Sequence, residues 1–306
     1  LSRVAAAPVM LEYSRRDDWL GVHGRWPTVQ YYKIGAMNDG TVTAMQMRGY
    51  SGMGPYRKNS GGISGMDVYA CPNRLRTIYP VYTNRTTSGN FRAPSEPHGF
   101  WGIESMMDDV AYKLGVDPVE FALKNMRRPT DDRPFTNYSL DEVITTGAEQ
   151  FDWASRRRVT PGSDEGPLKR GSGFSFMMFR AGVGTSSAIV RVDSAQNYTL
   201  FVGVTDIGPG AKTTMGMIAA EELGVPLSQV EVVSGDTDRC PYSVGESGSR
   251  TTIQTGYAVV QAAKDLKQQI AAQGMPSGSE VLIASATPVP NTDGKTRQCF
   301  GAHFVE

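Results

Sequence analysis

The sequence predicts an α+β fold, and three observations lead to this prediction. Residues 28–37 and 41–50 alternate apolar and polar side chains on either side of Asn38-Asp39-Gly40, a typical hairpin turn. Apolar residues then recur at helical spacing between Pro97 and Leu114. After a stretch rich in proline, glycine and charge at 160–170, strand-like and helical segments alternate again.

The remaining elements of the first half follow from local signals. Residues 75–82 are predicted to form a strand. Asp117 followed by Pro118 is the pattern of an N-cap with proline in the first turn, and it predicts a helix that ends near Met126. A further helix is expected over 139–157, with its apolar residues on one face.

The second half is expected to run in the order β-β-β-α-β-loop-α. The predicted elements are strands at 173–179, 188–193, 198–205 and 230–234, and helices at 211–223 and from 251 to about 270. An alternating segment at 299–306 predicts the start of one more strand. The stretch at 160–170 divides the chain into two expected domains, residues 1–160 and 161–306.

Composition argues against several classes of protein. The 31 basic and 31 acidic residues give a formal net charge of zero, which argues against a nucleic-acid-binding protein. No apolar run reaches the ~20 residues that a membrane span needs. The 3 cysteines and 3 histidines are scattered without metal-ligand spacing, so any metal is expected to arrive within a cofactor or on another chain.

Both ends of the chain differ from those expected of a complete domain. The sequence starts at Leu1 without a signal-peptide pattern, and it stops within the strand predicted at 299–306. We therefore expect one piece of a larger assembly, incomplete at both ends and located in the cytoplasm.

The most informative segment is the loop at 235–252, which is rich in glycine and serine and leads into the long helix. A helix start presents unpaired backbone N–H groups and the positive end of the helix dipole, which together favour an anion. A second glycine turn, Gly208-Pro209-Gly210, also precedes a helix. Alone, such a turn is more often a tight turn that needs glycine for its φ angles. Two of them in one half indicate a cofactor that carries phosphate.

A third segment, Asn90 to Gly99, lies between a predicted strand and a predicted helix and contains two prolines. A loop stiffened by proline holds its arginine, Arg92, and its backbone amides in place, as recognition of an anion or a carbonyl requires. An ordinary connection with a surface arginine fits the pattern equally well. Glu246 could act as a base, but a solvent-facing carboxylate or a partner of the helix dipole is the commoner case.

Several motifs occur in the order found in one enzyme family. The run TNRTTSGNFRAPSEPHGFWGIESMMDDVAYKLGVDPVEFALKNM is followed by GVTDIGPG, AAEELGVP, VEVVSGDTDRCPYSVGESGSRTT and FGAHFVE. Together with the earlier PV and SRRDD segments, these motifs resemble the molybdenum-cofactor subunit of the xanthine oxidase (molybdenum hydroxylase) family. The resemblance covers nearly the whole chain.

The resemblance implies a fold, a cofactor and partners. The expected fold is that of the two molybdopterin-binding domains of this family, each α+β. The implied cofactor is a molybdopterin with molybdenum, commonly the cytosine dinucleotide form in bacteria, and no protein side chain ligates the metal. The implied reaction is hydroxylation of an electron-poor carbon with oxygen from water. Electrons would leave through [2Fe–2S] clusters and FAD on an iron–sulfur subunit and a flavin subunit, in a dimer of heteromers.

The resemblance also implies roles for individual residues. Arg92 would orient the substrate, and Ala93 would make a backbone contact near the metal. The substrate pocket would include Arg57, Phe91 and Pro94. The pterin and its phosphate tail would be held by Gly208, Pro209, Gly210, Ser247, Gly248, Ser249 and Arg250.

The chain departs from the family pattern in three places. The usual glutamine between two glycines is Pro209, which puts a hydrogen bond to the cofactor in question. Pro94 stands where an aromatic residue is common, so the substrate is open among N-heterocycles, aldehydes and aromatic thioesters. The catalytic glutamate of a G-x-G-E motif would follow Glu306, so we expect it on a partner chain.

Three hypotheses follow from the sequence. The preferred one is the molybdopterin-binding portion of a multi-subunit hydroxylase, which could also run reductively. The second is a non-catalytic structural or cofactor-carrying subunit of such a complex. The third, an anion-binding domain unrelated to molybdenum, leaves the order of the motifs unexplained.

Overall fold

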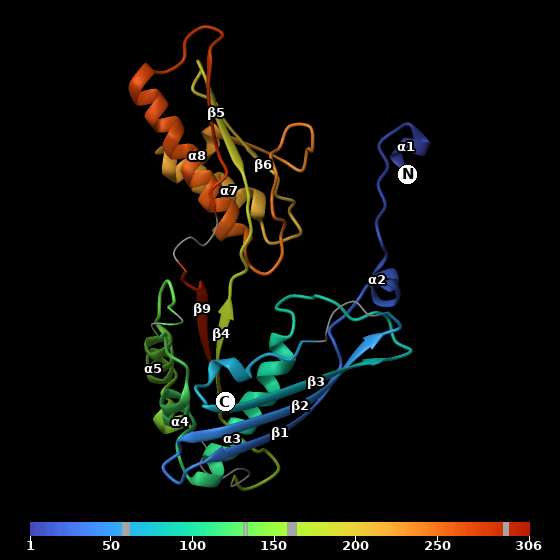
Figure 1. Cartoon of the computed structure of the whole chain (residues 1–306), viewed down its shortest axis with the longest axis vertical. Helices are drawn as coiled ribbons and strands as arrows, with labels where there is room; N and C mark the ends of the chain where they lie inside the picture. Colours follow the sequence, from blue (N-terminus) through green and yellow to red (C-terminus); the bar gives the residue numbers. More distant parts are fainter. Residues whose placement is uncertain (57–61, 131, 133, 158–163, 290–293) are drawn as a thin grey trace. The chain divides into compact units, whose positions relative to one another are not determined.

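The computed structural model describes residues 1–56, 62–130, 132, 134–157, 164–289 and 294–306 (Figure 1). The chain forms two compact units. Unit 1 contains Leu1–Arg128, Ser139–Met178 and Phe300–Glu306, and unit 2 contains Pro129–Tyr138 and Phe179–Cys299. The predicted domain boundary between residues 160 and 161 lies outside the described residues, so it stays a prediction.

Unit 1 is built on a three-stranded sheet in the order β1-β2-β3. The predicted hairpin is confirmed: β1 (Thr28–Ala36) pairs antiparallel with β2 (Val42–Gly54), and Gly40 in the turn has a φ of 83°. The strand predicted at 75–82 is β3 (Asn73–Tyr82), which pairs parallel with β2. A parallel neighbour requires a crossover connection, and the described part of the chain between β2 and β3 includes the 3-10 helix at Met66–Val68.

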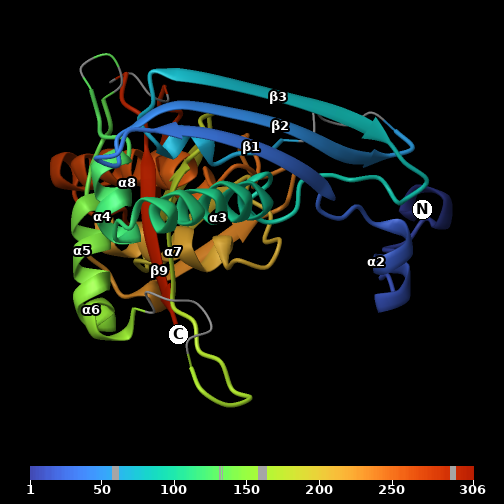
Figure 2. The ribbon, with the colours of Figure 1, turned by 90° about the horizontal axis from the view of Figure 1, so that it is seen from below.

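Helix α3 (Glu96–Leu114) lies along one face of this sheet (Figure 2). It buries Ile103, Met107 and Ala111 on its inward side. The predicted N-cap of the next helix is also confirmed, because the Asp117 carboxylate accepts the backbone N–H groups of Val119 and Glu120. The other helices of unit 1 are α1 (Ser2–Ala5), α2 (Arg15–Gly21), the 3-10 helix η1 (Met66–Val68), α4 (Pro118–Asn125), α5 (Leu140–Phe151) and α6 (Trp153–Arg156).

The single helix predicted over 139–157 is wrong, because the helix breaks at Asp152. Asp152 has a φ of 57°, in the left-handed region that aspartate tolerates better than most residues. The break turns Trp153 inward, where its Nε1 donates to Asp117 Oδ2 at 3.0 Å. The pattern of apolar residues continues through the break, which is why the sequence alone suggested one helix.

Two strands of unit 1 come from distant parts of the sequence. Strand β4 (Gly173–Arg180) pairs only with β9 (Gln298–Val305) among the described strands. Phe304 of β9 stacks on Phe151 with ring centres 5.7 Å apart, so β9 also packs against the end of α5.

Unit 2 is a four-stranded sheet in the order β7-β6-β5-β8, packed against two helices. Its strands are β5 (Ala188–Asp193), β6 (Tyr198–Val202), β7 (Val230–Ser234) and β8 (Val281–Ala286), and its helices are α7 (Ala211–Leu223), the 3-10 helix η2 (Leu227–Gln229) and α8 (Thr251–Gln273). Strand β8 was not predicted. Its short apolar run, VLIASA, follows α8 after the connection at residues 274–280 and carries no distinct pattern.

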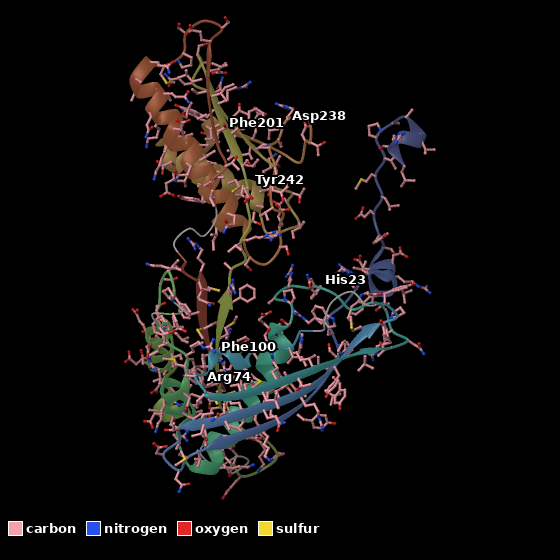
Figure 3. The ribbon with its side chains drawn as sticks, viewed as in Figure 1. His23, Arg74, Phe100, Phe201, Asp238 and Tyr242 are labelled. Atoms are coloured by element: carbon pink, nitrogen blue, oxygen red, sulfur yellow. The ribbon has the colours of Figure 1, made fainter. Side chains whose placement is uncertain are left out.

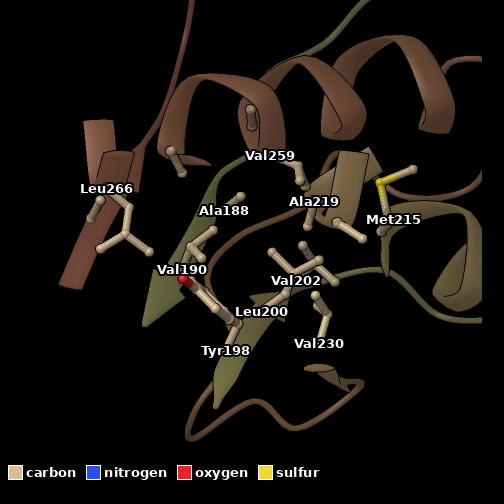
Figure 4. Close-up of a cluster of buried hydrophobic side chains, with 14 of the residues drawn as sticks. Ala188, Val190, Tyr198, Leu200, Val202, Met215, Ala219, Val230, Val259 and Leu266 are labelled. Carbon is tan, nitrogen blue, oxygen red and sulfur yellow. The ribbon is translucent and has the colours of Figure 1, made fainter. Parts of the chain in front are cut away.

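The core of unit 2 lies between the sheet and these helices (Figure 4). Val190 of β5, Leu200 of β6, Met215 of α7 and Val259 of α8 are each fully buried. Burying one such side chain contributes roughly 1.5–3 kcal/mol, so this core holds α7 and α8 against the sheet. In the described part of the chain, no helix is long and apolar enough to cross a membrane.

Candidate functional site

The loop at 235–250, here called the α8 loop, is held by backbone contacts to residues 182–187. The backbone N–H of Gly182 donates to the carbonyl of Gly248 at 2.6 Å, and that of Ser187 donates to the carbonyl of Tyr242 at 2.9 Å. The N–H of Val244 donates to the Ser186 hydroxyl at 3.2 Å. The loop is therefore ordered at both its middle and its end.

Arg250 uses its guanidinium group to hold the α8 loop. Its three nitrogens donate to the carbonyls of Val183, Val244 and Gly245, at 3.2, 2.8 and 3.3 Å. The sequence predicted that Arg250 would contact the cofactor phosphate. In the structure its side chain serves the fold of the loop, and a contact with the cofactor stays a prediction.

The start of α8 keeps the features predicted for an anion site. Arg250 is the N-cap residue and no side chain caps the helix. The N–H groups of the first turn have no partner inside the helix, as in any α-helix. Ser247, Gly248 and Ser249 are exposed, and both Gly248 and Ser249 have positive φ, 64° and 55°.

In the second glycine turn, two backbone N–H groups already have a partner within the chain. The Asp206 carboxylate accepts the N–H groups of Gly208 and Gly210, at 2.9 and 3.1 Å. These backbone hydrogen bonds lower the pKa of Asp206, with that to Gly208 the largest cause. The chain thus supplies its own anion at the start of α7, and Pro209 between the glycines has no N–H to offer.

A hydrogen bond joins the two glycine segments. The Thr205 hydroxyl donates to Glu246 Oε2 at 2.6 Å, while Glu246 Oε1 is buried and has no hydrogen-bond partner among the described residues. The α8 loop also reaches β6, where the guanidinium carbon of Arg239 lies 5.4 Å from the ring centre of Phe201. Figure 3 labels Phe201 together with Asp238 and Tyr242 of the loop. Gly203 permits this approach, because a β-carbon there would collide with the Pro241 carbonyl.

In unit 1, the predicted substrate loop is supported by Arg25. Its Nη1 donates to the Ala93 carbonyl at 3.1 Å, and its guanidinium carbon lies 5.1 Å from the ring centre of Phe91. Ala93 and Ser95 have positive φ, 50° and 72°. A positive φ in a residue other than glycine strains the backbone, and such strained residues cluster at functional sites.

Arg92 itself is exposed and makes no hydrogen bond or ion pair with the described residues. Pro94 beside it is half-buried, and Phe91 is 52% exposed. Arg57, predicted for the same pocket, lies outside the described residues. Unit 1 therefore brings Phe91, Arg92, Ala93 and Pro94 together on one loop, and unit 2 brings the two glycine segments together.

A cavity of about 530 Å³ opens beside Ala93 in unit 1. Phe100 and Trp101 of α3 line it together with residues of β4 and β9, and Figure 3 marks Phe100. Glu104, also in its wall, is buried, and this burial raises its pKa to about 7 against the hydrogen bonds from Tyr69 and the Phe176 N–H. Burial also raises the pKa of Glu96 at the start of α3.

Some residues of these sites were missed by the sequence reasoning. Asp206 could have been found, because an aspartate two residues before a glycine is typical of an Asx turn. Arg25 and Thr205 carry no local signal, since each acts through a contact distant in the sequence. Within the described ranges, no group of three or more His, Cys, Asp or Glu side chains is placed to hold a metal ion.

The comparisons with known proteins agree with the resemblance. Two family models described as molybdopterin cofactor-binding domain match residues 1–126 and 146–296. The chain is 33% identical over 292 residues to a xanthine dehydrogenase molybdenum-binding subunit of Escherichia coli O157:H7, covering 89% of this chain and 38% of that protein. It is 34% identical over 275 residues to an aldehyde oxidoreductase molybdenum-binding subunit of Escherichia coli K12, covering 88% and 37%.

Solved structures share the fold. The aldehyde oxidoreductase of Desulfovibrio gigas has a TM-score of 0.78 at 22% identity, over 95% of this chain and 36% of that one. Quinoline 2-oxidoreductase of Pseudomonas putida 86 has a TM-score of 0.79 at 21% identity, over 99% and 47%. The expected fold, two mixed α+β molybdopterin-binding domains, is confirmed.

These matches place the chain in the class of molybdopterin-binding proteins. Within it, the chain belongs to the xanthine oxidase family, as a molybdenum-binding subunit. The chain spans about 38% of the length of the curated relatives it matches. Two observations fit the cofactor: the uncapped start of α8 suits a phosphate, and the unpaired Glu246 oxygen suits a hydrogen-bond donor.

Proposed function

We propose that this chain is the molybdopterin-binding portion of a molybdenum hydroxylase. The complete enzyme hydroxylates, or reductively dehydroxylates, an electron-poor carbon of a heterocycle, an aldehyde or an aromatic compound, with oxygen from water. The observation that carries this proposal is the pair of cofactor-domain matches, at 1–126 and 146–296, in a chain whose α8 loop opens an uncapped helix.

The chain's own residues have distinct tasks in this proposal. The first turn of α8, with Ser247, Gly248 and Ser249 before it, binds the phosphate of the cofactor through backbone N–H groups. Arg250 keeps that loop in shape through its three carbonyl contacts. Gly208, Pro209 and Gly210 form a wall of the same site, and Asp206 accepts the N–H groups of the two glycines.

The loop of unit 1 serves the substrate. Arg92 orients it through charge and hydrogen bonding, while Arg25 holds the Ala93 carbonyl and the Phe91 ring behind it. Phe91, Pro94 and Arg57 complete the pocket. The bound molybdopterin supplies the oxygen transfer and the electron exchange.

Partners belong to the same proposal. A chain with the catalytic glutamate of the G-x-G-E motif, an iron–sulfur subunit and a flavin subunit complete the enzyme in the cytoplasm, and the cofactor is the cytosine dinucleotide form. Relatives described as molybdenum-binding subunits support a multi-subunit arrangement.

A non-catalytic, cofactor-carrying subunit is the alternative. Metal analysis and mass spectrometry of the complex purified with this chain separate the two. We expect molybdenum, a pterin and a partner polypeptide with G-x-G-E. A complex without molybdenum or pterin contradicts the proposed function, whereas a loaded complex in which no polypeptide carries G-x-G-E favours the alternative.

A further inference from the structure

One carboxylate oxygen in unit 2, Glu246 Oε1, makes no hydrogen bond with the described residues. Glu246 Oε2 accepts the Thr205 hydroxyl at 2.6 Å, but Glu246 Oε1 is buried without a hydrogen-bond partner among the described residues. Leaving a buried acceptor unpaired costs about 1–3 kcal/mol, and more when the group is charged. Native proteins rarely carry such an oxygen without a ligand, an ion or a bound water to satisfy it.

The charges around Glu246 select the kind of ligand. Asp206, next to Thr205, adds a second carboxylate on the neighbouring segment, where it accepts the N–H groups of Gly208 and Gly210. The guanidinium of Arg250 is directed at three backbone carbonyls instead of at either carboxylate. At the carboxylates themselves, a ligand group that donates hydrogen bonds is favoured over one that carries negative charge.

We propose that Glu246 is a cofactor-binding residue whose free oxygen accepts a hydrogen bond from an N–H group of the pterin heterocycle. This inference rests on the proposed function. A pterin carries amino and ring N–H groups that donate hydrogen bonds, and a carboxylate oxygen can accept them. The backbone N–H groups of a phosphate site are donors themselves, so they cannot. The phosphate is then left to the first turn of α8, five residues further along the chain at Thr251.

The substitution Glu246→Ala, set beside Thr205→Val, tests this inference. Thr205→Val removes only the hydrogen bond inside the chain, whereas Glu246→Ala removes that bond and also the acceptor for the pterin. An amide at position 246 would not serve, because it can turn its oxygen towards the pterin and donate its NH₂ to the Thr205 hydroxyl. We expect molybdenum and pterin content, measured by metal analysis and by fluorescence of the released pterin, to fall on the order of tenfold in Glu246→Ala and to stay near that of the unchanged chain in Thr205→Val. The urea midpoints of the two variants, both free of cofactor, should agree.

The matched control is Glu231→Gln, which removes the same charge from an exposed position of β7 in the same unit. It should retain full cofactor content. Each protein is purified as the full chain with its co-purifying polypeptides. If Glu246→Ala is loaded as fully as the unchanged chain, the inference is wrong and the proposed function stands. If Thr205→Val loses as much cofactor as Glu246→Ala, or if cofactor-free Glu246→Ala is much less stable than cofactor-free Thr205→Val, Glu246 is structural and the inference is wrong. An unchanged chain without molybdenum or pterin overturns both.

Discussion

The Tyr69 hydroxyl donates a hydrogen bond to Glu104 Oε1 at 2.6 Å, deep inside unit 1. The other carboxylate oxygen of Glu104 accepts the backbone N–H of Phe176 at 3.1 Å, so this side chain ties α3 to β4. Because Glu104 is buried, its pKa rises from 4.5 to about 7, with the nearby charge of Asp108 as a minor further cause.

This arrangement predicts that unit 1 loses stability as the pH rises. Folded Glu104 keeps its proton up to about pH 7, whereas the unfolded chain releases it near 4.5, so its contribution is complete below 4.5 and is lost as the pH passes 7. The loss is at most about 3 kcal/mol, since one pKa unit corresponds to about 1.4 kcal/mol. Urea unfolding of Glu104→Gln between pH 4.5 and 8 should show a flatter pH dependence than the unchanged chain. Glu149→Gln, at an exposed position of α5, is the control, and equal slopes in all three proteins would contradict the prediction.

Replacing Arg92 with alanine should lower turnover on the order of a hundredfold and leave cofactor content intact. An arginine that orients substrate acts mainly in the transition state, and loss of one such group has effects of this size. Turnover is measured with a dye as electron acceptor, beside metal analysis of the same sample. Arg85→Ala, at another exposed arginine of unit 1, should keep its turnover. A parallel loss of molybdenum in Arg92→Ala would assign Arg92 a structural role.

Arg250→Lys should destabilise unit 2 by roughly 1–3 kcal/mol, because one ammonium group cannot reach three carbonyls and hydrogen bonds to charged groups contribute about this much. The free energy of unfolding of the cofactor-free chain in urea measures the effect. Lys264→Met, at an exposed position on α8, provides the control. Full stability combined with reduced cofactor content would instead mean that Arg250 binds the cofactor directly.

Gly248 offers a test of how closely the cofactor approaches the α8 loop. A β-carbon there would meet only the Gly182 Cα, at 3.8 Å, so the fold has room for a side chain. Its φ of 64° is tolerated by asparagine but costs leucine roughly 1–2 kcal/mol. We expect both Gly248→Asn and Gly248→Leu to lose molybdenum and pterin, measured by metal analysis and pterin fluorescence. Loss in the leucine variant alone would point to backbone strain.

Much of the fold could be predicted because its elements carry local signals. The turn at Asn38-Asp39-Gly40 and the cap at Asp117 each fix an element through neighbours in the sequence. The break at Asp152 depends instead on Trp153 reaching a distant carboxylate. The pairing of β4 with β9 is equally non-local, and no pattern within either strand specifies it.

The candidate site also has features that local sequence predicts and features that it does not. The glycine turns and the start of α8 could be located from spacing, since backbone amides at a helix start are a property of local sequence. What those amides and side chains contact could not. The Asp206 carboxylate takes two amides that were assigned to the cofactor, and the Arg250 guanidinium turns to carbonyls of its own chain. The assigned cofactor roles of these residues stay predictions.

The pairing of β4 with β9 sets the order in which the chain can fold during synthesis. Apart from Pro129–Tyr138, unit 2 runs from the last residues of β4 to the first residues of β9. Its strands and helices are therefore synthesised before β9, and β4 cannot pair with β9 until the end of this chain is made. Unit 1 closes last, when β9 arrives and brings Phe304 to the rings of Phe151 and Phe174. Until then the aromatic residues of β4 are exposed to aggregation and to chaperones.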